Sequence, residues 1–196
     1  PTTPSVVHFY DAEGVVVGEE ATKMVVIDPE NIVRFVKRHM GESKDYEFFG
    51  QHYTPQEISA LILRKIKSDA EQLLGVPVTD AVITVPAYFN SAQRGATAEA
   101  GAIAGLNVLS IINEPTAAAI AYGMDRLGED RNLLIFDLGG GTFDVTVMKI
   151  RGHKLTTIAS DGNAEPGGKD WDDRLLDFAA EQFFSKFRID PRDTPS

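Results

Sequence analysis

The chain has 196 residues, of which 43% are hydrophobic and 24% charged, a balance typical of globular proteins rather than disordered ones. Its formal net charge of −10 argues against a nucleic-acid partner, because binding to a phosphate backbone requires clustered lysines and arginines. The absence of cysteine excludes disulfides, thiolate nucleophiles and thiolate metal ligands. It is also compatible with a reducing compartment, so we expect a cytoplasmic protein without a nucleic-acid partner. No apolar run reaches the ~18 residues of a membrane span, so no membrane partner is expected.

The first predicted elements form a hairpin and a helix. Residues 5–10 and 14–17 are apolar and β-branched around an Asp-Ala-Glu-Gly turn, which predicts the hairpin. The Asp-Pro pair at 28–29 then supplies an N-cap and a first-turn proline. Apolar residues recur at helical spacing from there to Gly41, namely Ile32, Val33, Val36 and Met40. A helix is therefore predicted between the hairpin and Gly41.

The clearest helix signal lies in residues 54–75. Thr54 and Glu57 have the spacing of a capping box, and Pro55 takes the first helical position. Gly75 suits the end of the helix, because glycine readily adopts the left-handed conformation found there.

Two apolar strands follow, at 81–86 and 108–112, and a helix is predicted after each. The first of these helices would span 91–105 with Ser91 as its cap, and the second would begin at Pro115. Apolar strands that alternate with helices indicate parallel crossovers and a sheet covered on both faces. The predicted fold class is α/β.

The organisation changes after the charged residues 125–131. Strands are predicted at 133–137, 142–150 and 154–160, and an amphipathic helix follows at 171–187. Because an antiparallel meander starts here without a helical crossover, we predict a domain boundary at the charged residues.

Three consecutive glycines, Gly139 to Gly141, separate the first two strands of this meander. Glycine lets another molecule approach the backbone closely, so successive amide N–H groups can point at one anion. Asp137 and Asp144 would repel a bare phosphate but suit a site where Mg²⁺ joins them to a nucleotide, and Thr142 adds a hydroxyl for the terminal phosphate. A strand follows the glycines, unlike in the P-loop or the dinucleotide motif. The alternative is a glycine-rich hairpin with two solvated aspartates.

Four stretches resemble one known family. They are DLGGGTFDVTVMKI at 137–150, VTDAVITVPAYFNSAQRGATAEAGAIAGLNVLSIINEPTAAAIAYG at 78–123, TPQEISALILRKIKSDAEQLLG at 54–75, and TPSVVHF at 3–9. The first is similar to the second phosphate loop of the actin-like ATPase superfamily, which includes actin and the sugar kinases. The other three resemble its DnaK-type seventy-kilodalton heat-shock chaperone branch.

The resemblance implies an α/β, actin-like ATPase fold with two ribonuclease-H-like lobes, mixed sheets flanked by helices, and ATP or ADP with Mg²⁺ in the cleft between the lobes. Residues 1–124 would form most of the first lobe, residues 125–131 a link, and residues 132–196 the opening βββα part of the second lobe. The family's first phosphate loop would precede residue 1. Its adenosine-binding helix, third glycine loop and peptide-binding domain would follow residue 196.

The resemblance also implies roles for individual residues. Asp137 would position Mg²⁺ and the attacking water, Gly139 to Gly141 would bind phosphates through their backbone, and Thr142 would contact the γ-phosphate. Asp144 would support the water shell of the metal, and Glu114 would face it from the other lobe. For Glu114, a capping role before the next proline is the alternative.

Two further residues are implied to link the nucleotide state to interdomain signalling, namely Pro86 and Arg94. A strand terminator and a surface arginine in the first turn of a helix are the alternative interpretations of these residues.

The chain departs from the family pattern in two places. A Gly-x-x-Ala-Lys segment, whose lysine we expect to contact the attacking water, is represented by residues 18–22 with Thr22 at the lysine position, so Lys23 is the candidate for that role. Residues 166–172 correspond to the family's Leu-Gly-Gly-Glu-Asp-Phe-Asp segment, and Lys169 stands where the family has the glutamate. Its glycine pair, Gly167 and Gly168, is retained for contact with the nucleotide.

The function implied is that of an ATP-hydrolysing molecular chaperone that binds and releases unfolded polypeptides, with this chain as part of its nucleotide-binding domain. The implied partners are a J-domain co-chaperone, a nucleotide-exchange factor and unfolded client peptides. We expect the chain by itself to bind ATP weakly and to hydrolyse it negligibly. The alternatives are a non-catalytic nucleotide-sensing module, which the displaced lysine and Lys169 favour, and an actin-like filament protein or sugar kinase.

Overall fold

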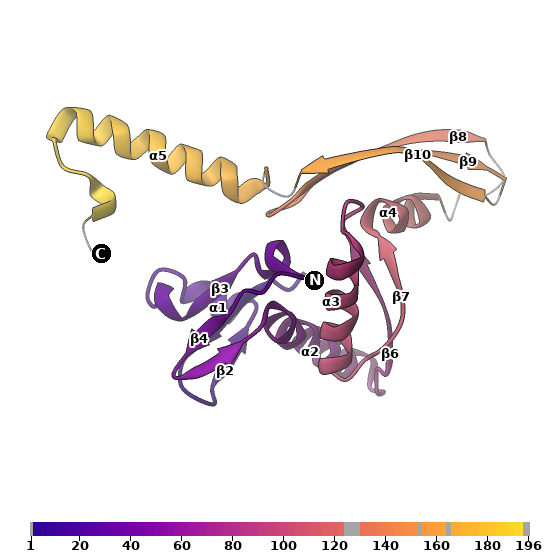
Figure 1. Ribbon diagram of the computed structural model, residues 1–196, viewed down its shortest axis with the longest axis horizontal. Helices are drawn as coiled ribbons and strands as arrows, with labels where there is room; N and C mark the ends of the chain where they lie inside the picture. The colour runs from indigo at the N-terminus through magenta and orange to yellow at the C-terminus, as the bar shows by residue number, and fades with distance from the viewer. Residues whose placement is uncertain (1, 124–129, 153, 164–165, 194–196) are drawn as a thin grey trace.

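Two groups of helices and strands make up the computed structural model, which describes residues 2–123, 130–152, 154–163 and 166–193 (Figure 1). We call residues 2–123 the first lobe and the described residues from 130 onward the second lobe. Within these residues no helix is long and apolar enough to cross a membrane.

The first lobe begins with a small antiparallel sheet in the order β2-β1-β3. Its strands are β1 (Val6–Phe9), β2 (Val15–Val17) and β3 (Ile32–Arg34), and α1 (Glu19–Lys23) follows β2. The predicted hairpin of β1 and β2 is confirmed, because Val7 pairs with Val17 and Phe9 with Val15.

The helix predicted between the hairpin and Gly41 is wrong. The chain instead forms the 3₁₀ turn η1 (Pro29–Asn31), strand β3 and the 3₁₀ turn η2 (Val36–His39). Two observations explain the difference. The β-branched residues at the start of β3 extend the sheet by pairing with β1, and Phe35 adopts a left-handed conformation with φ 57° that breaks any helix.

Helix α2 (Pro55–Leu74) organises the core of the first lobe. The predicted capping box at Thr54 and Glu57 is confirmed, and Gly75 ends the helix with φ 71°. The hairpin β4 (Tyr46–Phe48) and β5 (Gln51–Tyr53) precedes α2. Buried residues of α2 pack against β1 and β4 in one cluster that includes Val7, Phe9, Val33, Phe48, Ile58 and Ile62.

The alternating elements of the first lobe are β6 (Asp80–Val85), α3 (Ser91–Ile103), β7 (Asn107–Asn113) and α4 (Glu114–Gly123). The predicted parallel crossover is confirmed, because β6 and β7 pair in parallel. These strands form a separate two-stranded sheet. Coverage on both faces is not found within the described residues, since Val82 and Leu109 are exposed.

The cap of α3 also differs from the prediction. Asn90, not Ser91, accepts a hydrogen bond from the amide of Gln93, and the Gln93 side chain accepts one from the Asn90 amide. Since the capping box starts one residue earlier, Ser91 is the first helical residue.

The second lobe has the predicted βββα order. Strands β8 (Arg131–Leu138), β9 (Phe143–Arg151) and β10 (Lys154–Asn163) form an antiparallel sheet in the order β10-β9-β8, followed by α5 (Gly168–Phe187) and the 3₁₀ turn η4 (Pro191–Asp193). Figure 1 shows α5 running away from the three strands. Most of the predicted link at 125–131 lies outside the described residues, so the domain boundary stays a prediction.

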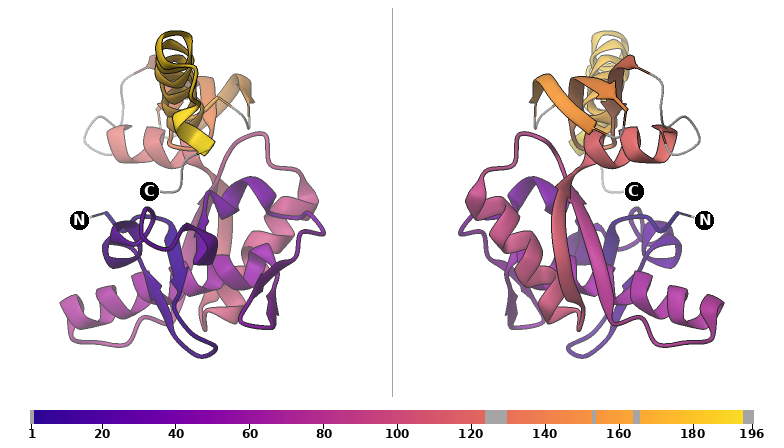
Figure 2. Two further views of the ribbon diagram at one scale, coloured as in Figure 1. Left: turned by 90° about the vertical axis from the view of Figure 1, so that its left-hand side faces the viewer. Right: turned by 90° about the vertical axis from the view of Figure 1, so that its right-hand side faces the viewer.

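Helix α4 lies between the two lobes, as both views in Figure 2 show. It contacts β6 and β7 of its own lobe and β8 and β9 of the second. The buried face of β9 carries Asp144, Thr146, Met148 and Ile150. The connection between the lobes therefore brings the start of α4, the end of β8 and the start of β9 to one place.

Candidate functional site

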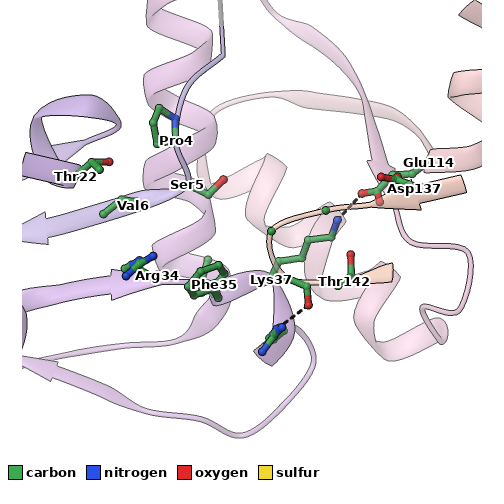
Figure 3. A pocket seen from close by; sticks show the side chains of 15 residues that line it. Pro4, Ser5, Val6, Thr22, Arg34, Phe35, Lys37, Glu114, Asp137 and Thr142 are labelled. Atoms are coloured by element: carbon green, nitrogen blue, oxygen red, sulfur yellow. Dashed lines mark hydrogen bonds and ion pairs between the residues drawn. The ribbon is translucent and has the colours of Figure 1, made fainter. Parts of the chain in front are cut away.

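A cavity of about 630 Å³ opens where the two lobes meet (Figure 3). The first lobe contributes Thr22 from α1, the segment 34–38 and Glu114 at the start of α4. The second lobe contributes Asp137 and the residues 139–142. The cavity thus collects the predicted tri-glycine turn, Gly139–Gly141, and two of the three predicted carboxylates.

All three carbonyl groups of the tri-glycine turn are held by donors outside it. The Gly139 carbonyl accepts a hydrogen bond from the Gly168 amide at 3.0 Å, and the Gly140 carbonyl accepts one from the Lys169 amide at 2.9 Å. The Gly141 carbonyl accepts one from Arg38 Nε at 2.8 Å. The turn is therefore fixed by the start of α5 on one side and by the first lobe on the other.

The amide groups of the turn divide into two kinds. Gly139 donates to the Thr142 carbonyl at 2.9 Å and closes the turn. Among the described residues, no acceptor lies within hydrogen-bonding reach of the Gly140 and Gly141 amides. The anion-binding nest predicted from three amides is therefore reduced to two, because the turn itself uses the first.

The geometry explains why residue 167 is a glycine, but it does not require glycine at the three positions of the turn. None of the three turn glycines has a positive φ. A Cβ atom on Gly167, by contrast, would lie 2.5 Å from the carbonyl carbon of Gly141 and 2.6 Å from the Gly140 oxygen. Gly167 must lack a side chain because the start of α5 packs directly on the backbone of the turn.

Asp144 is the most perturbed carboxyl group of the site. It is 2% exposed, and its Oδ1 atom has no hydrogen-bond partner among the described residues. Burial, followed by the charges of Glu114 and Asp137, raises its pKa to about 6. Asp137 faces Asp144 across the β8–β9 pairing. The three carboxylates therefore create a concentrated negative potential beside the cavity.

This arrangement suits a cation with a water shell better than one bound directly. Within the described residues, no group of three acidic or histidine side chains is close enough to hold a metal ion. The orphaned buried oxygen of Asp144 and the hard carboxylate donors nonetheless match the preference of Mg²⁺, which usually keeps several waters. The residues present fit a hydrated Mg²⁺.

The lysine of the cavity is Lys37, which the sequence analysis missed. Its Nζ atom donates to Glu114 Oε1 at 2.6 Å, and Figure 3 shows it reaching from the first lobe toward Glu114 and Asp137. Lys23 is 65% exposed, pairs with Glu20 and does not line the cavity. The cluster of cations at residues 34–39 of an acidic chain was the available signal, but the incorrect helix prediction concealed it.

Two hydroxyl groups extend the site. Thr142 is buried and lines the cavity. Tyr88, also absent from the sequence prediction, hydrogen-bonds to Thr142, while burial and the nearby charge of Asp144 raise its pKa to about 12. The Tyr88 hydroxyl therefore stays protonated and can orient the Thr142 side chain.

Pro86 and Arg94 lie just outside the cavity. Pro86 is fully buried directly after β6. The Arg94 guanidinium donates to the Phe89 carbonyl at 2.9 Å and to Asn113 Oδ1 at 2.7 Å. Arg94 is thus an anchor between the ends of β6 and β7, next to Glu114, and not a free surface arginine.

Lys169 does not place its charge in the cavity. Its ammonium group pairs with Asp173 one turn further along α5, whereas its backbone amide binds the tri-glycine turn. The charge reversal noted in the sequence therefore leaves the glycine contacts intact.

A βββα unit with a glycine turn between its first two strands, facing a second α/β unit across a cavity, defines the actin-like ATPase class of folds. The model of the Hsp70 protein family matches residues 1–48 and 44–196. The chain belongs to the Hsp70 family.

Curated relatives agree with this assignment. The chaperone protein DnaK of Thermotoga neapolitana is 51% identical over 191 residues, which cover 97% of this chain and 32% of the relative. The chaperone protein DnaK of Thermotoga maritima has the same identity and coverage. The chaperone protein DnaK of Thermosipho africanus is 49% identical over 192 residues, covering 98% of this chain and 32% of the relative. The chain spans about a third of the length of these relatives.

Proposed function

We propose that this chain forms one wall of the ATP site of a DnaK-type chaperone and supplies its second phosphate loop. The observation that carries the proposal is the orientation of the tri-glycine turn. All three of its carbonyls are held from outside, while the Gly140 and Gly141 amides remain available beside Lys37. Two backbone donors and an ammonium group in one cavity favour a phosphate group.

The reaction we propose is hydrolysis of ATP to ADP by in-line attack of water on the γ-phosphate. Catalysis of this kind comes mainly from positioning and electrostatic stabilisation. The amides of Gly140 and Gly141 would bind phosphate oxygens, and the Thr142 hydroxyl would contact the terminal phosphate. Lys37 would move its charge from Glu114 toward the phosphate as negative charge develops there.

The carboxylates have a separate part in this proposal. Asp137 would orient the attacking water from the end of β8, and Asp144 and Glu114 would accept hydrogen bonds from the water shell of Mg²⁺. When bound, Mg²⁺ would neutralise charge on the phosphate oxygens. Ionised Asp144 would be stabilised by the cation, since its raised pKa reflects burial near two other carboxylates.

The non-catalytic alternative loses its main support. It depended on a displaced lysine at residues 22–23 and on the charge of Lys169. Lys37 supplies a cation in the cavity, and the Lys169 ammonium group pairs within α5. We therefore favour the ATPase.

The whole protein's partners follow only from the family. We propose a J-domain co-chaperone, a nucleotide-exchange factor and unfolded client peptides as its partners, and the cytoplasm as its location. Because phosphate ligands come from both sides of such a cleft, the 196-residue chain by itself should bind ATP more weakly than a micromolar dissociation constant. Calorimetry in Mg²⁺ buffer measures this directly, and micromolar affinity would contradict it.

The experiment that tests the function compares two lysines. This chain would replace the matched segment in the DnaK of Thermotoga maritima, and single-turnover ATP hydrolysis would be measured for Lys37→Ala and Lys23→Ala. Loss of an electrostatic group at the reacting phosphate should lower the rate about 10²–10³-fold for Lys37→Ala. Lys23→Ala should stay within about twofold. Equal effects, or no hydrolysis by a folded parent chimera, would reject the proposal.

A further inference from the structure

Phe35 and Arg38 line the cavity next to the tri-glycine turn, and Arg38 donates a hydrogen bond to one of the carbonyl groups of the turn. We propose that these two residues position the turn from the first lobe, and that Arg38 couples it to the start of α5 through Asp170. Their effect on phosphate binding rests on the proposed function. The positioning itself can be measured without nucleotide.

The guanidinium group of Arg38 donates to two groups among the described residues of the second lobe. Nε donates to the Gly141 carbonyl at 2.8 Å, Nη1 donates to Asp170 Oδ1 at 3.2 Å, and Nη2 donates to Asp170 Oδ2. The planar fork of arginine can satisfy a carbonyl and both oxygens of one carboxylate together, whereas a lysine ammonium offers no such fixed geometry. The arginine is therefore matched to a bridging role.

Asp170 connects this bridge to α5. Its Oδ2 atom also accepts a hydrogen bond from the Gly167 amide at 2.7 Å, and a carboxylate suits the first turn of a helix because the exposed amides there carry partial positive charge. The Arg38 hydrogen bonds, followed by that of Gly167, lower the pKa of Asp170 to about 2. The bridge thus stays charged at any pH above about 4.

Phe35 lies close to Arg38 and to the turn. Two guanidinium groups lie near its ring, with Arg34 at 4.9 Å and Arg38 at 5.8 Å from the ring centroid. The ring also lies next to the turn, since a Cβ atom built on Gly140 or Gly141 would contact it at 3.8 or 3.6 Å. The left-handed backbone of Phe35, rare for a non-glycine residue, is what aims the ring at the turn.

These contacts make the turn and the start of α5 a single unit. The amides of Gly168 and Lys169 bind the first two carbonyls of the turn, and Arg38 binds the third carbonyl as well as Asp170. Loss of Arg38 should therefore loosen hydrogen bonds that it does not itself make.

The test is amide hydrogen exchange at Gly168 and Lys169 in the nucleotide-free chain, measured by NMR with ¹⁵N-labelled glycine and lysine. Both amides should exchange at least about fivefold faster in Arg38→Ala, because the opening of their bonds to the turn becomes easier. Arg38→Lys should resemble Arg38→Ala, and Phe35→Ala should lie between the parent and Arg38→Ala. The control is Arg64→Ala, since Arg64 donates to the Ile103 carbonyl at 3.3 Å and to no residue of the turn or of α5 that the structure describes. Unchanged exchange in a folded Arg38→Ala variant would overturn the inference.

Asp170→Asn keeps the experiment decisive if Arg38→Ala fails to fold. It removes the charge of the bridge but leaves an acceptor for Arg38, so a smaller acceleration at the same two amides is expected, and none would count against the bridge. The chimera with Thermotoga maritima DnaK then separates the two proposals. If it hydrolyses ATP, Arg38→Ala should raise KM more than it lowers kcat. If the parent chimera does not bind ATP, the proposed function fails while the exchange rates still decide the positioning role.

Discussion

The two lobes on either side of the cavity differ in how far their apolar side chains are buried. The first lobe surrounds α2 with buried residues, and Phe9 stacks on Phe48 with ring centroids 4.3 Å apart. The second lobe leaves large apolar side chains exposed on β8 and on α5, among them Leu134, Phe136, Leu175, Leu176 and Phe178. Within the described residues, the second lobe therefore depends on hydrogen bonds and on α4, whereas the first has its own core.

This difference bears on where function resides. The tri-glycine turn belongs to the weakly packed lobe, but its carbonyls are held partly by Arg38 of the well-packed one. The turn is therefore supported from both lobes, by the start of α5 and by Arg38.

The largest expected effect separates the lobes directly. Phe9→Ala should destabilise the protein by about 3–5 kcal/mol, because Phe9 is 1% exposed in the main cluster and its removal leaves a cavity. Phe136→Ala should change stability by less than about 0.5 kcal/mol, since Phe136 is 65% exposed. Urea unfolding measures both. Similar losses would mean that both lobes have comparable cores.

Gly167→Ala tests whether the start of α5 packs on the turn. Its Cβ atom would meet backbone atoms of Gly140 and Gly141 that cannot move aside, so a loss of about 1–3 kcal/mol is expected together with weaker nucleotide binding. Gly95 in α3 is the matched control, because nothing lies within 4 Å of an added Cβ. Gly95→Ala should stabilise by about 0.5–1 kcal/mol. Thermal unfolding that shows no difference between the two variants would contradict the packing.

Asp144→Asn should stabilise the metal-free protein. The pKa of Asp144 is raised to about 6, so the folded state binds more protons than the unfolded state between about pH 4 and pH 6, and stability falls as the pH rises through that window. Asparagine has no charged form, so the variant should gain about 1–3 kcal/mol above pH 6 and nothing below about pH 4. Urea unfolding at pH 4 and pH 7.5 checks the sign. A gain that is the same at both pH values would refute the electrostatic cause.

The smallest expected effect compares how helices begin in the two lobes. Helix α3 starts with the Asn90 capping box, so Asn90→Ala should cost about 1 kcal/mol and Ser91→Ala less than about 0.5 kcal/mol. Helix α5 has Gly167 at its cap, which has no side chain to accept a hydrogen bond. The Asp170 side chain accepts from the Gly167 amide, and the tri-glycine turn accepts from the next two amides. Circular dichroism during thermal unfolding distinguishes the two alanine variants. Equal losses of stability in the two variants would contradict the assignment of Asn90 as the cap.

Sequence patterns gave the fold where local signals agreed with tertiary packing. The capping box at Thr54, the parallel β6–β7 crossover and the βββα order all follow from periodicity and turn residues. The helix predicted before Gly41 failed because β-branched residues paired with a strand and Phe35 took a left-handed conformation, and neither is visible in apolar spacing.

The sequence analysis named the residues that the second lobe contributes to the cavity and Glu114 of the first lobe, but not Lys37 or Arg38. Asp137, Asp144 and the glycines are contiguous in sequence, so a local pattern identifies them. Lys37 and Arg38 reach the cavity only through the tertiary arrangement of η2 against the second lobe. Lys23 was chosen because it lies one residue after the lysine position of the family's Gly-x-x-Ala-Lys segment, and the structure places it at the surface.

The hydrogen bonds between the tri-glycine turn and the first amides of α5 would transmit a movement of the turn to this helix. Helix α5 contains 20 residues and so extends roughly 30 Å from the turn. For a helix of this length, a tilt of about 10° at the base would displace the far end by about 5 Å. A small change in the backbone of the turn would therefore produce a much larger displacement at the far end of α5, enough to change the contacts that this end makes.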